Sequence, residues 1–171
     1  MQSTPAPEPP AGRSLAYVGL GANLGQAVQT LEAAFAAMAA LPATRLVGRS
    51  ALYRSAPVDA HGPDFTNAVA ALATSLAPAD LLARLQAIEN DHGRERTYRN
   101  APRTLDLDLL CVGQQTHASP TLTLPHPRLH QRAFVLRPLL ELAPDLDLPG
   151  LGPLNLWLAG VADQPIERVE P

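Results

Sequence analysis

The chain has 171 residues, of which 46% are hydrophobic and 17% are charged, and its formal net charge is −3. This composition favours one globular domain with a sizeable core. The charge gives no reason to expect binding to nucleic acid or to an acidic membrane. No apolar run approaches the ~18 residues that a membrane span requires. A single cysteine, Cys111, excludes a disulfide within the chain and favours a cytoplasmic location.

The first residues are rich in proline and lack the apolar stretch of a signal peptide. Proline cannot continue a helix or donate to a sheet ladder, so we expect residues 1–14 to form a disordered tail. Residues 15–171 are then expected to form a single domain.

Hydrophobic periodicity predicts the elements that follow, in chain order. These are a strand over 15–20, a helix over 26–41, strands over 45–55 and 65–74, a helix from Pro78 to about Gly93, a strand over 103–112, and helices over 133–143 and 153–161. The order β-α-β-β-α-β is that of the ferredoxin-like split βαβ pattern. The sequence therefore predicts an α+β, ferredoxin-like sandwich with a mainly antiparallel sheet and helices packed on it.

Two acids interrupt the leucine-rich strand predicted over 103–112. Asp106 and Asp108 are two residues apart, so their side chains should point to the same face. The other face should enter a core and carry Leu105, Leu107, Leu109 and Cys111. Carboxylates at this spacing suit Mg²⁺, or a pair of metal ions. On the spacing alone, acids that pair with arginines of a neighbouring strand are an equally good interpretation.

Basic residues gather around these acids. Six of the thirteen arginines lie within 39 residues: Arg94, Arg96, Arg99, Arg103, Arg128 and Arg132. Because guanidinium groups bind phosphate oxygens bidentately, the combination indicates a polyphosphate site, with a solvated basic loop as the alternative. The chain has no lysine, which excludes a Walker P-loop and Schiff-base chemistry.

Four segments carry a family resemblance: YVGLGANLG (17–25), FTNAVA (65–70), APRTLDLDLL (101–110) and PHPRLHQRAF (125–134). Together they resemble the 6-hydroxymethyl-7,8-dihydropterin pyrophosphokinases of folate biosynthesis, over about residues 15–160. The resemblance implies transfer of pyrophosphate from ATP to the pterin hydroxymethyl group, with release of AMP. It also implies two Mg²⁺ ions held by Asp106 and Asp108, with Asp108 as a candidate acceptor of the hydroxyl proton.

The resemblance assigns further residues to the two substrates. The implied ATP-binding residues are Gln86, Glu89, Arg94, Arg103, Leu109, His126 and Arg132. The implied pterin-binding residues are Ser55, Val58, Phe65, Asn67, Asp106 and Phe134, in which the two phenylalanines stack on the ring and Asn67 contacts its edge. Arg94 and Arg103 join the two acids in the implied catalytic set. Without the resemblance, the phenylalanines would be interpreted as core, Asn67 as a strand-end cap and His126 as a turn residue.

Two polar loops, 55–64 and 94–102, are expected to order over the substrates and exclude water. The chain departs from some family members at two positions. Asn100 stands where they carry a tryptophan that closes over the site, and Thr121 stands where they carry a basic residue near the nucleotide. A lid contact and one positive contact to ATP are therefore in question.

Three other classes of protein compete with this hypothesis. A binding protein that lost the chemistry would not need both acids, and a structural ferredoxin-like domain would need neither acids nor arginines. A Rossmann dinucleotide enzyme requires a third glycine where Leu24 stands, and a different element order. The expected partners are ATP and the pterin, without nucleic acid or membrane, and the expected state is a monomer, with a weak dimer as the alternative.

Overall fold

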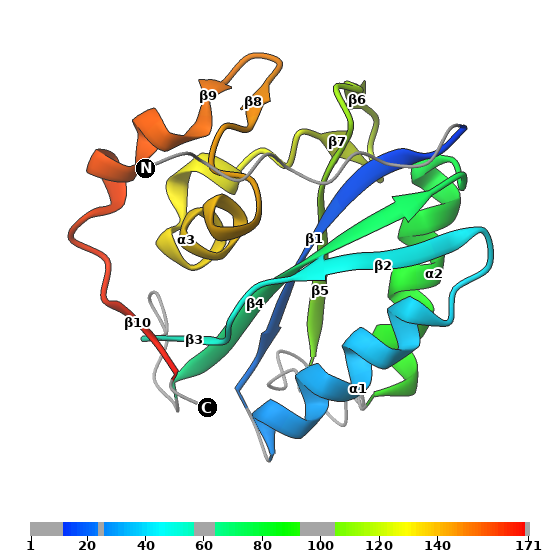
Figure 1. The fold of residues 1–171 in the computed structure, drawn as a ribbon, viewed down its shortest axis with the longest axis horizontal. Helices are drawn as coiled ribbons and strands as arrows, with labels where there is room; N and C mark the ends of the chain where they lie inside the picture. The colour runs from blue at the N-terminus through cyan, green and yellow to red at the C-terminus, as the bar shows by residue number, and fades with distance from the viewer. Residues whose placement is uncertain (1–11, 24–25, 57–63, 93–104, 170–171) are drawn as a thin grey trace.

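The structure is a computed structural model that describes residues 12–23, 26–56, 64–92 and 105–169 (Figure 1). The first half contains β1 (Ser14–Ala22), α1 (Ala27–Ala39), β2 (Thr44–Arg49), β3 (Tyr53–Ser55), β4 (Phe65–Thr74) and α2 (Pro78–Asp91). The second half contains β5 (Asp106–Val112), β6 (His117–Ala118), β7 (Thr123–Leu124), the 3₁₀ turn η1 (Leu129–Gln131), α3 (Ala133–Leu142), β8 (Asp147–Leu148), β9 (Gly152–Pro153), the 3₁₀ helix η2 (Leu154–Val161) and β10 (Ile166–Arg168).

A six-stranded sheet forms the centre of the molecule. Its order is β10-β3-β4-β1-β5, with β2 also paired to β4, and every pairing is antiparallel. Strands β3, β4, β1 and β5 with helices α1 and α2 reproduce the ferredoxin-like arrangement, so the predicted fold class is confirmed. An antiparallel sheet also rules out the parallel Rossmann alternative.

Helices α1 and α2 cover one face of the sheet (Figure 1). In α1 the buried stripe is Leu31, Ala34, Phe35 and Met38, at the spacing that an amphipathic helix requires. Pro78 occupies the first turn of α2, where its missing N–H is harmless, and the buried residues include Leu81, Leu85 and Ile88. The hydrophobic core on this face also includes Val18 and Leu20 of β1 and Leu107 of β5, and Glu89 of α2 is buried beside it.

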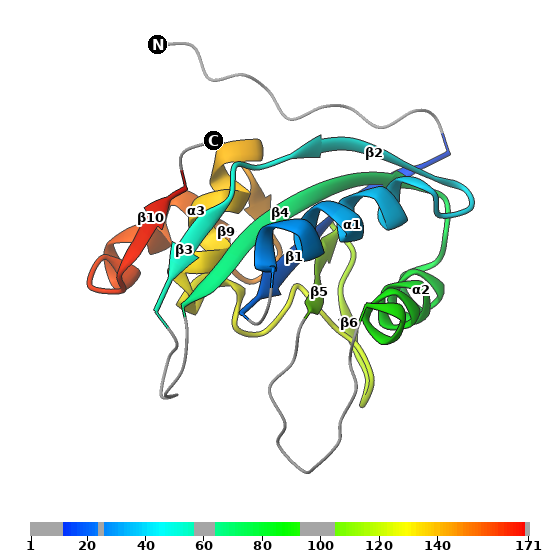
Figure 2. The same cartoon turned by 90° about the horizontal axis from the view of Figure 1, so that it is seen from below.

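Helix α3 and the C-terminal segment cover the opposite face, as the view from below shows (Figure 2). Their core includes Leu136 and Leu139 of α3 with Tyr17 of β1 and Cys111 of β5. The Tyr53 hydroxyl donates a 2.6 Å hydrogen bond to Glu141 Oε1, which ties β3 to the end of α3. The sheet is therefore the middle of three layers.

One predicted strand, 45–55, is wrong as a single element, because it is broken into β2 and β3. Ser50 lies between them and is buried. Its N–H donates to the Val69 carbonyl at 2.9 Å, while its side-chain hydroxyl, in place of a backbone carbonyl, accepts the Val69 N–H at 2.9 Å. The Ser50 hydroxyl thus takes the place of a backbone carbonyl in the pairing with β4, and the regular ladder is interrupted between β2 and β3.

The predicted orientation of Cys111 is also wrong, because the β1–β5 ladder contains a bulge. Tyr17 pairs with Cys111 but Val18 pairs with Leu109, so Leu110 is an extra residue on β5. One extra residue reverses the alternation of side chains. Leu109 accordingly packs under α1 and α2 as predicted, whereas Cys111 packs under α3.

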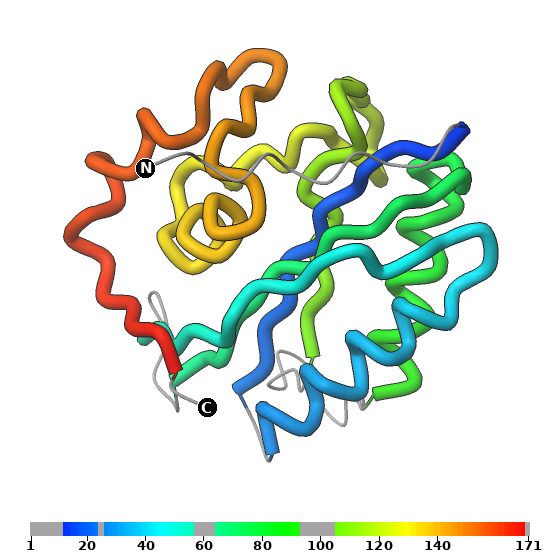
Figure 3. The backbone as a smooth tube through the Cα atoms, viewed as in Figure 1, coloured from blue at the N-terminus to red at the C-terminus, as the bar shows by residue number. Residues whose placement is uncertain are grey.

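The C-terminal region was only partly predicted. The helix expected over 153–161 is a 3₁₀ helix, and the short hairpins β6–β7 and β8–β9 and strand β10 had no clear sequence pattern. The backbone trace shows the last segment running from η2 past α3 to the sheet, where β10 pairs with β3 (Figure 3). At the other end, Ser14 already belongs to β1, so the predicted tail is one residue too long there, and residues 1–11 lie outside the described part.

Candidate active site

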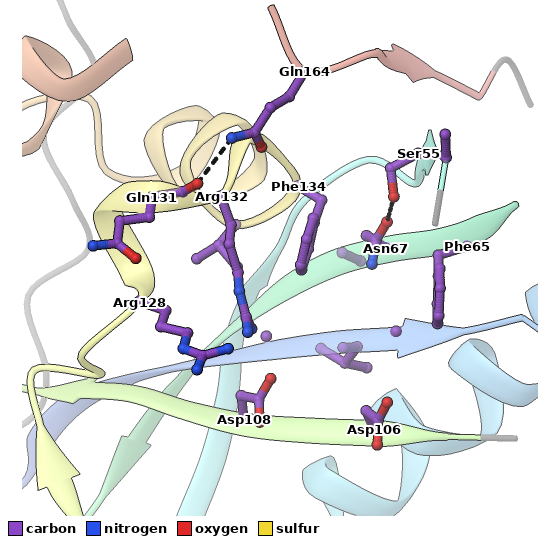
Figure 4. A pocket seen from close by; sticks show the side chains of 16 residues that line it. Ser55, Phe65, Asn67, Asp106, Asp108, Arg128, Gln131, Arg132, Phe134 and Gln164 are labelled. Atoms are coloured by element: carbon purple, nitrogen blue, oxygen red, sulfur yellow. Dashed lines mark hydrogen bonds between the residues drawn. The ribbon is translucent and has the colours of Figure 1, made fainter. Parts of the chain in front are cut away.

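A cavity of about 570 Å³ lies between the sheet and α3, and we call it the α3 cavity (Figure 4). Its floor comes from β1 and β5, and its walls come from β3, β4, α3 and the C-terminal segment. The residues that line it include Gly19, Gly21, Ser55, Phe65, Asn67, Asp106, Asp108, Arg128, Gln131, Arg132, Phe134 and Gln164. The pterin-binding residues predicted within the described part of the chain all line this one cavity.

A second cavity, of about 340 Å³, lies beside α2, and we call it the α2 cavity. It is lined by Gln86 and Glu89 of α2, Leu107, Asp108 and Leu109 of β5, His126, and the hairpin residues Ser119 to Thr123. Asp108 lines both cavities. Asp106, Asp108, His126, Pro127, Arg128 and Arg132 line a third hollow, which we call the junction. The two cavities thus meet around β5, the edge strand of the sheet.

The floor of the α3 cavity is open because two glycines of β1 lie opposite functional side chains. Gly19 pairs with Asp108, and Gly21 pairs with both Asp106 and Asn67. A Cβ atom on Gly21 would lie 3.1 Å from the Asn67 side-chain nitrogen, which is a tight contact. The missing side chains therefore leave room above the acids.

Asp106 and Asp108 are half-buried and point into the α3 cavity, while Arg128 and Arg132 reach toward Asp108 from the opposite wall (Figure 4). Strand alternation puts the acids on this face, as predicted. Among the described residues, no three His, Cys, Asp or Glu side chains gather as a metal site. Two carboxylates in an open cavity fit Mg²⁺, which keeps several waters and completes its shell with substrate phosphates.

His126 lies where the two cavities meet. Its backbone N–H donates to the Leu110 carbonyl at 2.8 Å, and its Nδ1 accepts the Arg128 N–H at 3.1 Å. With Nδ1 as an acceptor, the neutral ring carries its proton on Nε2. Burial lowers the pKa of His126, Asp108 opposes that effect, and Arg132 and Arg128 reinforce it. In its neutral form the ring therefore presents Nε2–H as a donor.

Asn67 is held in one orientation on the wall of the α3 cavity. It is buried, and its Oδ1 accepts a 2.6 Å hydrogen bond from the Ser55 hydroxyl. This bond leaves the Nδ2 group as the donor that faces the cavity. In Figure 4 the rings of Phe65 and Phe134 lie on either side of this amide. A flat ligand between the rings would meet a fixed amide at its edge.

Glu89 is buried on α2, and its Oε2 accepts the Leu107 N–H at 2.9 Å. Leu107 lies between the two acids, so this carboxylate braces the strand that carries them. The resemblance gave Glu89 only a nucleotide role, and its contact with β5 was not predicted. Gln86, one turn earlier on α2, is exposed at the same cavity.

The remaining predicted residues divide into two groups. Leu109 and His126 line the α2 cavity, and Arg132 lines the α3 cavity and the junction. Arg94, Arg103, Val58 and Asn100, and the centres of both predicted lids, lie outside the described residues. Thr121 lines the α2 cavity.

Sequence reasoning missed three residues that line the α3 cavity. Arg128 was counted among the clustered arginines without a role, and Gln131 stands in the same segment, so the quoted motif could have indicated both. Gln164 had no sequence signal, because only the path of the C-terminal segment brings it to the cavity.

The described residues include no helix that is long and apolar enough to cross a membrane.

An antiparallel α+β domain with two acids and two arginines between adjoining cavities has the features of an enzyme that transfers a phosphorus-containing group. A sequence model of the 7,8-dihydro-6-hydroxymethylpterin-pyrophosphokinase (HPPK) family matches residues 17–144. The chain therefore belongs to this family. It is 51% identical over 154 residues to a 2-amino-4-hydroxy-6-hydroxymethyldihydropteridine pyrophosphokinase of Pseudomonas aeruginosa, which covers 90% of this chain and 95% of the relative.

A second relative of the same name, from Haemophilus influenzae, is 42% identical over 157 residues, or 91% of this chain and 98% of the relative. The fold is also that of a solved structure, the wild-type HPPK-DHPS of Plasmodium falciparum, with a TM-score of 0.69 at 14% identity. That alignment covers 86% of this chain but only 44% of the solved chain, so this chain spans less than half of that protein.

Proposed function

We propose that the α3 cavity of this pyrophosphokinase binds the pterin, that the α2 cavity binds ATP, and that Asp106 and Asp108 hold two Mg²⁺ ions where the cavities meet. The enzyme transfers pyrophosphate from ATP to the hydroxymethyl group of 6-hydroxymethyl-7,8-dihydropterin and releases AMP, a step of folate biosynthesis. The observation that carries the assignment is that Asp108 lines both cavities.

The two acids and their surroundings fit this transfer. Attack on the β-phosphorus requires the hydroxyl, the phosphorus and the departing AMP to lie in line, with charge neutralised around them. Bound Mg²⁺ would neutralise phosphate charge and orient the oxygens. Arg128 and Arg132 face the same space and can bind phosphate oxygens bidentately. Asp108, next to the attacking hydroxyl, is the candidate acceptor of its proton.

The α3 cavity has the chemistry that a pterin requires. Phe65 and Phe134 offer faces for stacking, and stacking on aromatic side chains is favourable for a flat heterocycle. The fixed Nδ2 donor of Asn67 selects an acceptor at the edge of the ring. The Ser55 hydroxyl keeps that orientation, since reversal of the amide would break its 2.6 Å bond.

The α2 cavity has the chemistry of a nucleotide site. It combines the exposed amide of Gln86 with hydroxyls of the β6–β7 hairpin and the Nε2–H of His126. We assign the adenosine end to the α2 side and the phosphates to the junction, where the arginines lie. Arg94, Arg103 and Val58 keep the roles that the resemblance gives them, as part of this proposal.

The cellular setting is proposed with the same reasoning. We assign a cytoplasmic, monomeric enzyme whose single domain spans residues 14–171 and whose substrates are ATP and the pterin. Gel filtration with light scattering tests the monomer. A mass near 36 kDa, twice the 18.1 kDa of one chain, would contradict it.

One experiment tests the reaction and the site together. The purified protein is incubated with Mg²⁺, ATP and 6-hydroxymethyl-7,8-dihydropterin, and the nucleotides are separated by chromatography. We expect AMP that depends on both pterin and Mg²⁺. Formation of ADP would contradict attack at the β-phosphorus, and tight pterin binding without turnover would favour a binding protein instead.

A further inference from the structure

The residue that precedes helix α3 provides no capping side chain for it. Arg132 is the extended residue between η1 and α3, with φ −127° and ψ 117°, and it makes no side-chain cap. An arginine side chain has no acceptor to offer to the first N–H groups of a helix. The N–H of Ala133 therefore needs an acceptor from elsewhere, because Ala133 is buried.

Gln164 supplies that acceptor from the C-terminal segment. Its Oε1 accepts the Ala133 N–H at 2.8 Å, and its Nε2 donates to the Gln131 carbonyl at 2.9 Å. The second bond is drawn in Figure 4. The amide thus bridges the backbone on both sides of Arg132.

The turn that Gln164 bridges is followed by the start of α3, and together they carry one side chain that we propose contacts each substrate. Arg132 lines the junction, Phe134 lines the α3 cavity, and the Arg132 Cζ atom lies 5.5 Å from the centre of the Phe134 ring. A shift in the first turn of α3 would move both side chains together. A loss of position of this kind is costly in a transfer that depends on alignment.

The bridge comes from outside the part of the chain that the family model matches, which ends at residue 144. The Gln164 N–H donates to the Val161 carbonyl at 3.0 Å, which closes a turn after η2, and β10 pairs with β3 two residues later. The backbone of Gln164 is therefore anchored on both sides, and its amide can act as a fixed template.

We propose that Gln164 is a positioning residue for pyrophosphoryl transfer, which holds Arg132 and Phe134 in the geometry that the two substrates require. This inference rests on the proposed function of the two cavities. Gln164 acts on the substrates through the first turn of α3.

The first test uses the full chain with Gln164→Ala. We expect the KM values for ATP and pterin each to rise about tenfold, since two hydrogen bonds that order the turn are lost. The matched control is Gln114→Ala, which loses a 2.8 Å bond from Nε2 to the Asp147 carbonyl and lines none of the three hollows described above. The control should leave both KM values unchanged. A Gln164→Ala protein that folds and keeps both wild-type KM values would overturn the proposal.

A second variant separates positioning from simple loss of folded protein. Gln164→Glu keeps an acceptor for the Ala133 N–H but loses the donor to the Gln131 carbonyl, so its KM values should lie between those of wild type and Gln164→Ala. In an Arg132→Ala background, Gln164→Ala should raise the KM for ATP no further. An additive rise there would contradict action through Arg132.

A ligand-free measurement keeps this inference distinct from the proposed function. Amide hydrogen exchange of Ala133 should accelerate in Gln164→Ala and stay near the wild-type rate in Gln164→Glu and Gln114→Ala. Unchanged exchange in Gln164→Ala would overturn the bridge even in a fully active enzyme. Absence of AMP from the wild-type protein would instead contradict the proposed function.

Discussion

The two cavities share an edge strand but differ in how their walls are built. The α2 cavity uses α2, β5 and the adjacent hairpin, and a buried hydrogen bond from the Leu107 N–H to Glu89 Oε2 ties α2 to β5. The α3 cavity is walled by segments far apart in the chain, and polar contacts fix its walls: Ser55 with Asn67, Tyr53 with Glu141, and Gln164 with the start of α3. Both cavities are thus held by tertiary hydrogen bonds, but the α3 cavity depends in addition on contacts between segments that are far apart in the chain.

The largest effect is expected from removal of the two acids that lie where the cavities meet. Asp106→Ala and Asp108→Ala should each lower turnover by at least about a thousandfold, because each removes a carboxylate that we propose holds Mg²⁺ where the cavities meet. Rates of AMP formation, with circular dichroism to show folding, measure this. Asp145→Asn, an exposed acid remote from the cavities, is the control. More than a tenth of wild-type activity in either alanine variant would contradict the shared metal site.

The next prediction separates the two cavities. Phe134→Ala should raise the KM for pterin about 10- to 100-fold, as expected for loss of one stacking face. Its effect on the KM for ATP should be smaller. Gln86→Ala should raise the KM for ATP, by less than Phe134→Ala raises the KM for pterin. It should leave the KM for pterin unchanged. The two-substrate kinetics of both variants give the answer, and equal effects on both substrates would mean that the cavities are not separate sites.

Substitution of Glu89 tests whether α2, which lines the α2 cavity, also holds β5 in place. Glu89→Ala leaves the buried Leu107 N–H without its 2.9 Å acceptor, so we expect a loss of about 2 kcal/mol in the free energy of unfolding. Gln86→Ala, one turn away and exposed, should change it by less than about 0.5 kcal/mol. Urea unfolding of both variants measures the contrast. Equal stability of the two would mean that the carboxylate contributes nothing to holding β5.

Two tyrosines on the α3 side should respond oppositely to loss of a hydroxyl. The Tyr17 hydroxyl is buried and has no hydrogen-bond partner among the described residues, whereas the Tyr53 hydroxyl donates to Glu141 at 2.6 Å. Tyr53→Phe should therefore destabilise by about 1–2 kcal/mol, and Tyr17→Phe should be neutral or stabilise by up to about 1 kcal/mol. Thermal or urea unfolding decides. A larger loss from Tyr17→Phe than from Tyr53→Phe would refute the importance of the β3–α3 link.

The smallest expected effect is a titration at the junction. Burial lowers the pKa of His126 below its ordinary value near 6.5, although Asp108 opposes this. A lowered pKa in the folded state means that the contribution of His126 to stability is present above about pH 6.5 and is lost as the pH falls through the folded value. NMR titration of the ring protons, assigned with His126→Gln, should give a midpoint below 6.5. A midpoint above 6.5 would show that Asp108 outweighs burial.

The sequence determined much of the α1–α2 side. The hydrophobic periods of α1, β4 and α2 and the helix start at Pro78 are local properties, so these elements and the ferredoxin-like order could be predicted. The alternation in β5 also sufficed to put Asp106 and Asp108 on one face. The residues of the described part that the resemblance assigns to the pterin could be predicted only through that resemblance, and the structure brings them to one cavity.

The features that the sequence did not predict are those in which a long-range contact overrides a local pattern. The split of 45–55 accompanies the hydrogen bond between Ser50 and Val69. Cys111 points to the opposite face from the predicted one because of a bulge in the pairing of β5 with β1. Neither feature leaves a pattern in the sequence of the strand itself. Glu89 acquires its second role only because α2 packs against β5. Gln164 reaches the α3 cavity because β10 pairs with β3 and draws the C-terminal segment past α3. Periodicity reports which face of an element is apolar, but the partner of a buried polar group is fixed only when distant segments pack.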